Sequence, residues 1–157
     1  MIVLRVEGDP ATWILGASSP ASVLQRDLIN QDGPVTVDVD APLKGRLVLS
    51  TRSLAHVAVL TPPAGWTSGG FIPAGWIPGG GIQPRGLLYV PSTTGPVPDN
   101  PGYTLPPFFD VAALESDIVT AMTDGTTIAV EVTEGIFSGS LLLNGAALPF
   151  VVISPAP

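Results

Sequence analysis

The feature that most constrains this chain is a long stretch that is nearly free of charge and rich in glycine and proline. Between Ser53 and Pro98 the only formally charged side chain is Arg85. Two similar segments follow one another within it, residues 63–72 and 73–82, and each begins with Pro-Ala-Gly-Trp. Flexible linkers are polar or charged and poor in aromatic residues. This stretch is therefore expected to lie against a protein surface.

The same stretch is too long for an ordinary connection. Residues 62–107 form a segment of roughly forty residues, whereas connections in compact domains usually have about 4–6 residues. We predict one domain over residues 1–157, with residues 62–107 as an extended arm inserted into it. Glycine allows close approach to a neighbour, and tryptophan anchors a contact. The arm residues expected to make that contact are Trp66, Phe71, Ile72, Trp76, Ile77, Ile82 and Arg85.

Charge is scarce over the whole chain. Charged residues make up 12% of the sequence, against about 25% in a typical soluble protein. A surface with so few charges is more readily explained if neighbouring subunits bury part of it. We therefore expect a homo-oligomer, a place in a larger protein lattice, or both. The 13 acidic and 6 basic residues give a net charge of −7 and leave no basic cluster. Nucleic acid and an anionic membrane surface are therefore not expected as partners.

Cysteine is absent from the sequence. This excludes disulfides, thiolate chemistry and cysteine metal sites, and we expect no cofactor. The first residues lack the basic segment, apolar core and cleavage site of a secretion signal, and no apolar run approaches membrane-spanning length. We expect a protein made in the cytoplasm and not secreted by a signal of its own.

Alternation of apolar and polar residues predicts most of the strands. Val35, Val37 and Val39 alternate with polar neighbours, as in a strand with one buried and one solvated face. Further strands are expected at residues 2–6, 46–50, 54–60, 127–133 and 140–143. Asn144-Gly145 lies between two apolar runs and predicts a tight hairpin that returns the chain over residues 146–153.

Capping residues indicate two helices. Ser19-Pro20 supplies an N-cap and a first-turn proline for the first helix, while Asp110 and Gly125 bound the second. The apolar residues expected to share a face are Val23, Leu24 and Leu28 in the first helix and Val111, Leu114, Ile118 and Met122 in the second. The predicted fold class is mainly β, a β-sandwich or barrel-like meander with one or two short helices and the long Gly/Pro-rich inserted loop.

Few residues qualify for catalysis or metal binding. His56, the only histidine, lies among apolar strand residues without a motif partner, so we interpret it as a partly buried or interface residue. Asp38 and Asp40 point the same way from one strand, which allows a calcium site with nearby Asp32 or an acid pair. The solvated face of an amphipathic strand predicts the same residues. We therefore expect no catalytic residues, and Asp38 and Asp40 are only weak candidates for metal binding.

Trp66 and Trp76 allow three interpretations: contact with another protein chain, binding of a glycan, or packing on their own domain. If they contact another chain, the variant Trp66→Ala with Trp76→Ala keeps the domain folded and weakens association by at least about 2 kcal/mol. Unfolding of this variant would assign the segment to its own core. Selective loss of affinity for a polysaccharide would favour glycan binding.

The chain is rich in Thr, Val, Gly and Pro, contains Lys44 as its only lysine, and combines a β-meander with the Asn144-Gly145 turn. In this general character it resembles the small structural proteins of tailed bacteriophages that infect high-GC bacteria, such as capsid decoration and tail proteins. The resemblance implies a virion component, located in the virion after cytoplasmic synthesis, that acts through protein-protein contacts. It assigns no site residue. The alternatives are a carbohydrate-binding module that uses the loop tryptophans and, third, an acid-pair hydrolase.

Overall fold

A computed structural model of the chain describes residues 1–9, 11–17, 20–30, 33–66, 86–90, 103–107, 109–134 and 137–154. These residues contain ten β-strands and two α-helices. The strands are β1 (Val3–Val6), β2 (Trp13–Leu15), β3 (Val35–Ala41), β4 (Gly45–Leu49), β5 (His56–Thr61), β6 (Leu87–Tyr89), β7 (Tyr103–Thr104), β8 (Thr127–Glu134), β9 (Phe137–Asn144) and β10 (Val152–Ser154). The helices are α1 (Ala21–Asn30) and α2 (Val111–Asp124).

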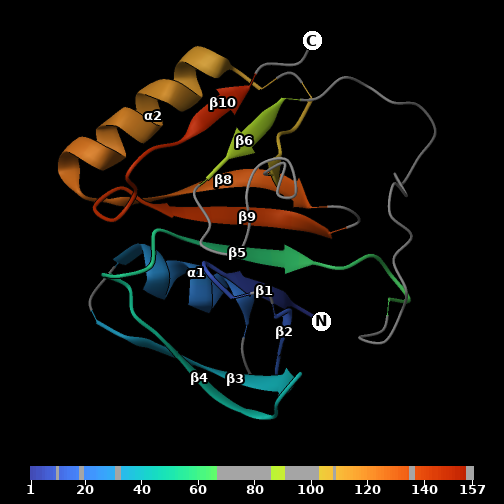
Figure 1. Cartoon of the computed structure of the whole chain (residues 1–157). Helices are drawn as coiled ribbons and strands as arrows, with labels where there is room; N and C mark the ends of the chain where they lie inside the picture. The colour runs from blue at the N-terminus through green and yellow to red at the C-terminus, as the bar shows by residue number, and fades with distance from the viewer. Residues whose placement is uncertain are drawn as a thin grey trace.

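The strands form one sheet in the order β10-β6-β7-β8-β9-β5-β1-β2-β3-β4, and the neighbours are antiparallel. Figure 1 shows the sheet running from β3 and β4 at one end of the molecule to β6 and β10 at the other. The predicted mainly β class with two short helices is confirmed. A single sheet carries all the strands of the described residues, and its two ends are β4 and β10.

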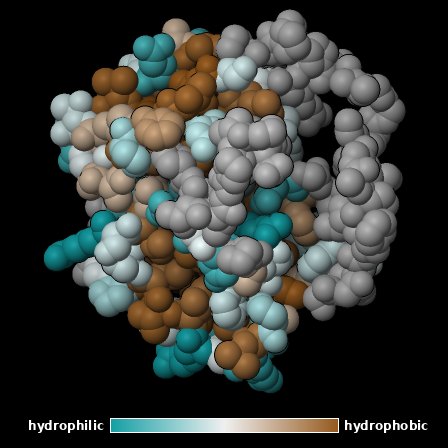
Figure 2. Space-filling view, in the orientation of Figure 1, coloured by the Kyte–Doolittle hydropathy of each residue, from teal (hydrophilic) through white to brown (hydrophobic). Residues whose placement is uncertain are grey.

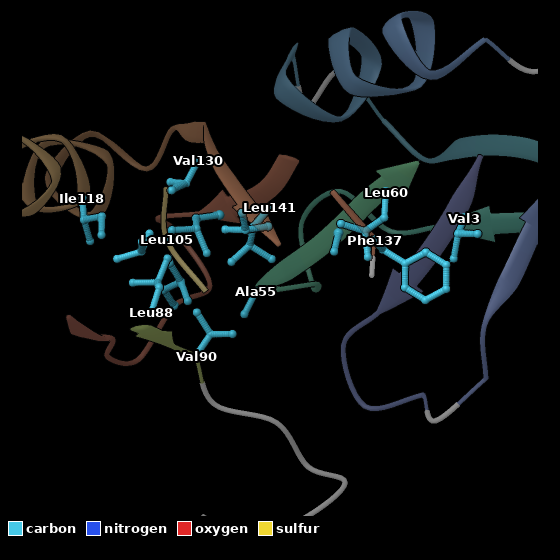
Figure 3. Close-up of a cluster of buried hydrophobic side chains, with 14 residues drawn as sticks. Val3, Ala55, Leu60, Leu88, Val90, Leu105, Ile118, Val130, Phe137 and Leu141 are labelled. Carbon is cyan, nitrogen blue, oxygen red and sulfur yellow. The ribbon is translucent and has the colours of Figure 1, made fainter. Parts of the chain in front are cut away.

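Buried apolar side chains form two clusters on opposite faces of this sheet. Ala58 of β5 belongs to the first cluster and its neighbour Val57 to the second, because successive strand residues point to opposite faces. Helix α2 contributes Ile118 to the first cluster, and α1 contributes Leu24 to the second. Figure 3 shows the first cluster, in which Ile118 faces side chains from the strands. Each helix therefore covers a different face.

The ends of α2 follow the sequence signals closely. Oδ1 of Asp110 accepts a hydrogen bond from the backbone N–H of Ala113 at 3.0 Å and caps the first turn. Gly125 ends the helix with a φ of 67°, a left-handed conformation that glycine adopts without strain. Its N–H donates to the carbonyl oxygen of Ala121. Both predicted caps are confirmed.

The predicted apolar faces of the helices are buried only in part. In α1, Leu24 is buried, whereas Val23 is exposed. In α2, Ile118 is buried, whereas Val111 at the first position is exposed. Ser19, the predicted N-cap of α1, lies outside the described residues. Sequence spacing thus identified the correct helices but included residues at the margins of their buried faces.

The predicted hairpin at Asn144-Gly145 is wrong. Strand β9 already pairs with β8 on one side and β5 on the other, so it has no free edge for a returning strand. Nδ2 of Asn144 instead donates to the carbonyl oxygens of Thr51 at 2.9 Å and Leu54 at 3.1 Å. The chain continues to β10, which pairs with β6 at the end of the sheet. Asn144 therefore anchors the end of β9 to the turn before β5.

Parts of the predicted arm belong to the sheet. Strand β6 pairs with β10 and β7, and β7 pairs with β8. Strands β2, β6 and β7 were not predicted because each contains only two or three residues, too few for an alternating pattern to be recognised. Residues 67–85 and 91–102 of the arm lie outside the described residues.

Candidate contact surfaces

Trp66 is the one predicted contact residue of the arm that the described residues include. It is half-buried against the first hydrophobic cluster. Its ring lies edge-on to Phe137, with 5.3 Å between the ring centroids and 82° between the planes. The indole Nε1 is buried and has no hydrogen-bond partner within the described part of the chain. Trp66 thus contacts its own domain through the first residue of β9.

This position bears on the interpretations of Trp66 as a glycan-binding residue and as a contact with another protein chain. A tryptophan that stacks on a sugar presents an open ring face, whereas Trp66 packs against its own cluster. The interface role therefore stays a prediction for the other arm residues, which lie outside the described residues: Phe71, Ile72, Trp76, Ile77, Ile82 and Arg85.

A polar cluster lies on the same face of the sheet. Nη2 of Arg5 in β1 is 3.4 Å from Oε1 of Glu134 in β8. Burial raises the pKa of the Glu134 carboxyl, and the charge of Arg5 offsets part of that rise. Burial also raises the pKa of Tyr103, and the Glu134 carboxylate raises it further. The buried His56 lies edge-on to Tyr103 at a centroid distance of 6.4 Å.

These four residues form a partly buried polar cluster on the first face of the sheet. A neutral Tyr103 phenol and an ion pair can hold strands together, but a nucleophile and its base are not evident among the residues just named. Sequence reasoning missed the cluster because its members come from β1, β5, β7 and β8. Only the sheet order brings them together.

Asp38 and Asp40 lie on the exposed face of β3, as the alternation predicted. Oδ1 of Asp38 is 3.5 Å from Nε of Arg46 on the neighbouring strand β4. Within the described residues, no group of three or more histidine, aspartate or glutamate side chains is placed to hold a metal ion. Asp32, the third residue of the proposed calcium site, lies outside them. The pair is accounted for as solvated strand surface.

An apolar groove runs between α2 and the segment that leads into β10. It has a volume of about 490 Å³, and among the described residues Glu115 is the only charged one that lines it. The other lining residues are Val111, Ile118, Val119, Met122, Pro149, Phe150, Val151 and Ile153. Figure 2 shows hydrophobic surface gathered at the top of the molecule, where Figure 1 places α2 and β10.

Side chains on the rim of this groove extend the apolar surface. Val119 is 54% exposed and Phe150 is 50% exposed. Val152, also 50% exposed, does not line the groove but lies next to it on the edge strand β10. Phe150 also stacks on Tyr89 of β6, with 6.4 Å between the ring centroids. The groove, the edge strand β10 and these side chains form one surface, which we call the α2–β10 surface. Sequence reasoning assigned Val111 and Met122 to a core face and did not predict this surface.

A second groove, of about 550 Å³, lies on the other side of α2, against β8. Its lining is more polar and includes Asp110, Asp117 and Glu131. Neither helix of the described residues is long and apolar enough to cross a membrane. A scan against family models, a search of curated proteins and a search of solved structures each found no match.

Proposed function

We propose that this chain is a structural protein that acts through protein-protein contacts inside a larger assembly, and that the α2–β10 surface is one of its contact sites. The observation that carries the proposal is the exposure of Val119 and Phe150, which line an apolar groove, together with that of Val152 on the adjoining edge strand β10. Contiguous apolar surface of this kind is typical of interfaces. The scarcity of charge over the chain supports the same conclusion.

The groove also has the composition of an interface centre. Interface cores are depleted in charged residues and enriched in aromatic residues and methionine. One charged residue, Glu115, lines this groove, together with Phe150 and Met122. Burying a half-exposed valine or phenylalanine contributes about 1 kcal/mol or more to association. Three such residues supply a useful share of the free energy that a stable contact needs.

The resemblance to small structural proteins of tailed phages gives the proposal its most concrete form. The assembly is then a virion, and the chain is a capsid decoration or tail protein that reaches the virion after cytoplasmic synthesis. Catalysis is not part of the proposal. We leave it out because the described residues around Asp38 and Asp40 contain no recognisable acid-base or metal-binding group.

The experiment is incorporation of tagged variants into the native assembly. Val119→Lys places a charge on the exposed rim of the groove and is expected to lower the fraction that sediments with particles at least about tenfold, as for an interface hot spot. The matched control is Ser116→Lys, which makes a similar change at an exposed position of α2 that does not line the groove. Equal incorporation of wild type and Val119→Lys would rule out this surface as a contact site.

A further inference from the structure

In the part of the chain that the structure describes, each end of the sheet has an open edge. Within the described residues, β4 pairs only with β3 and β10 pairs only with β6. An end strand presents a row of backbone N–H and C=O groups that a strand of another chain can pair with. The contact surfaces of this fold are therefore to be sought at these two ends.

Exposed apolar residues gather at the same two places. Of the nine large hydrophobic residues that are exposed in the described part of the chain, six lie there. Two are at the β4 end, where Leu43 is 71% and Val48 is 62% exposed. The four at the opposite end are Val111, Val119, Phe150 and Val152. Each end thus has apolar surface to bury against a partner.

The charged residues nearest to the two ends of the sheet differ in sign. The charged residues at the β4 strand are Lys44, just before it, and Arg46 within it, both basic and exposed. Asp38 and Asp40 lie one strand further in, and Asp38 is paired with Arg46. The charged residues of α2 are Glu115, Asp117 and Asp124, all of them acidic, and β10 has none. Of these, Glu115 lines the groove of the α2–β10 surface, whereas Asp117 lines the second groove against β8.

These charges discriminate between the ways in which two copies can meet. Contact between two β4 ends would place Lys44 and Arg46 against their own copies, and contact between two α2 ends would place Glu115 against its copy. Like charges brought together at an interface cost several kcal/mol, whereas opposite charges guide the correct pairing. Contact between unlike ends instead places the basic residues of the β4 end against Glu115.

We propose that the occupant of the α2–β10 surface is the β4 end of a second copy of this chain, so that copies join head to tail and the sheet continues from one to the next. The inference rests on the proposed assembly function and names its partner. A contact between unlike surfaces generates a ring if the rotation closes and a filament if it does not. Either product can form one layer of a larger assembly.

The test exchanges the charges of the two ends. The first variant carries Lys44→Glu and Arg46→Glu, and the second carries Glu115→Lys, the charged residue that lines the groove. We expect each variant alone, at low salt, to raise the dissociation constant for self-association at least about tenfold, since like charges then face each other. An equimolar mixture is expected to associate again, because every contact between unlike variants places opposite charges together. The control, Arg26→Glu with Asp27→Lys, swaps an exposed pair on α1 and should change nothing.

Sedimentation velocity over a concentration series reads out the result. Association of both variants at the wild-type level would overturn the inference, as would a mixture that fails to recover while each variant is folded by circular dichroism. A wild-type protein that is monomeric at every concentration would also overturn it. The proposed function would survive that last result if the monomer still entered native particles and Val119→Lys still prevented this.

Discussion

Replacing Asn144 tests the role that the structure gives to the end of β9. Its side chain is 5% exposed and donates two hydrogen bonds, to the carbonyl oxygens of Thr51 and Leu54. Its Oδ1 also accepts a hydrogen bond from the backbone N–H of Ala146 at 3.1 Å. Leaving a buried polar group without a partner costs about 1–3 kcal/mol. Because some of these groups regain water, we expect Asn144→Ala to lower the free energy of unfolding by about 3 kcal/mol.

The more decisive substitution is Asn144→Asp. In a two-residue hairpin turn, Asp-Gly replaces Asn-Gly with little loss. Here the aspartate cannot donate to Thr51 or Leu54, and its charge would face their carbonyl oxygens. We therefore expect a loss at least as large as that of the alanine variant.

Urea unfolding followed by circular dichroism measures both losses. With a slope of about 2 kcal/mol per molar urea, a loss of 3 kcal/mol moves the midpoint by about 1.5 M. The control Asn30→Ala, at the exposed end of α1, should change stability by less than about 0.5 kcal/mol. A loss below about 1 kcal/mol for Asn144→Asp would refute the anchoring role and favour a simple turn.

Three further predictions concern the first face of the sheet. Trp66→Ala alone should lower the free energy of unfolding by about 2 kcal/mol, because the half-buried ring packs on Phe137, and an unchanged melting temperature would contradict that packing. Gly139→Ala should lower the free energy of unfolding in urea by about 1–3 kcal/mol, because the new Cβ would collide with the backbone of Val59 and Leu60. The control Gly45→Ala, with open space around its Cβ, should lower it much less. Burial raises the pKa of Glu134, so the folded state binds its proton more tightly than the unfolded state, and stability should fall as pH rises from the ordinary carboxyl pKa to the raised one. Glu134→Gln should remove that part of the pH dependence, and an identical pH profile for the two proteins would contradict the assignment.

Local signals in the sequence were sufficient for several elements. The alternation around Val37 predicted β3 and its exposed Asp38, because one residue in two must face solvent in a half-buried strand. Asp110 and Gly125 predicted both ends of α2, because the capping interactions involve residues within one turn of the helix. In these cases, the interactions that determine the structure join residues that are close together in the sequence.

The sheet order could not be predicted in the same way. Strand β5 lies between β9 and β1, and this depends on pairings such as Ala58 with Leu141 that are far apart along the chain. The same pairings leave no edge for a hairpin at Asn144, which is why a strong local signal failed there. They also assemble Arg5, Tyr103 and Glu134 from three strands, so this cluster was not predictable from spacing.

The α2–β10 surface was missed for a related reason. Helical spacing assigned Val111 and Met122 to a core face, and Met122 does pack against the first cluster, whereas Val111 is exposed. Both residues also line the groove beside Phe150. Periodicity identifies the apolar side of a helix, whereas the extent of its cover depends on how many strands lie beside it.

Zero-length cross-linking is the sharpest test of the head-to-tail contact, because Lys44 is the only lysine in the chain. A carbodiimide joins an amine to a carboxylate only when the two are in contact. We expect covalent dimers and higher species that contain a link from Lys44 to Glu115, formed between differently labelled copies in an isotope-mixed sample. Links confined to one copy, or associated protein with no link from Lys44 to Glu115, would contradict that contact.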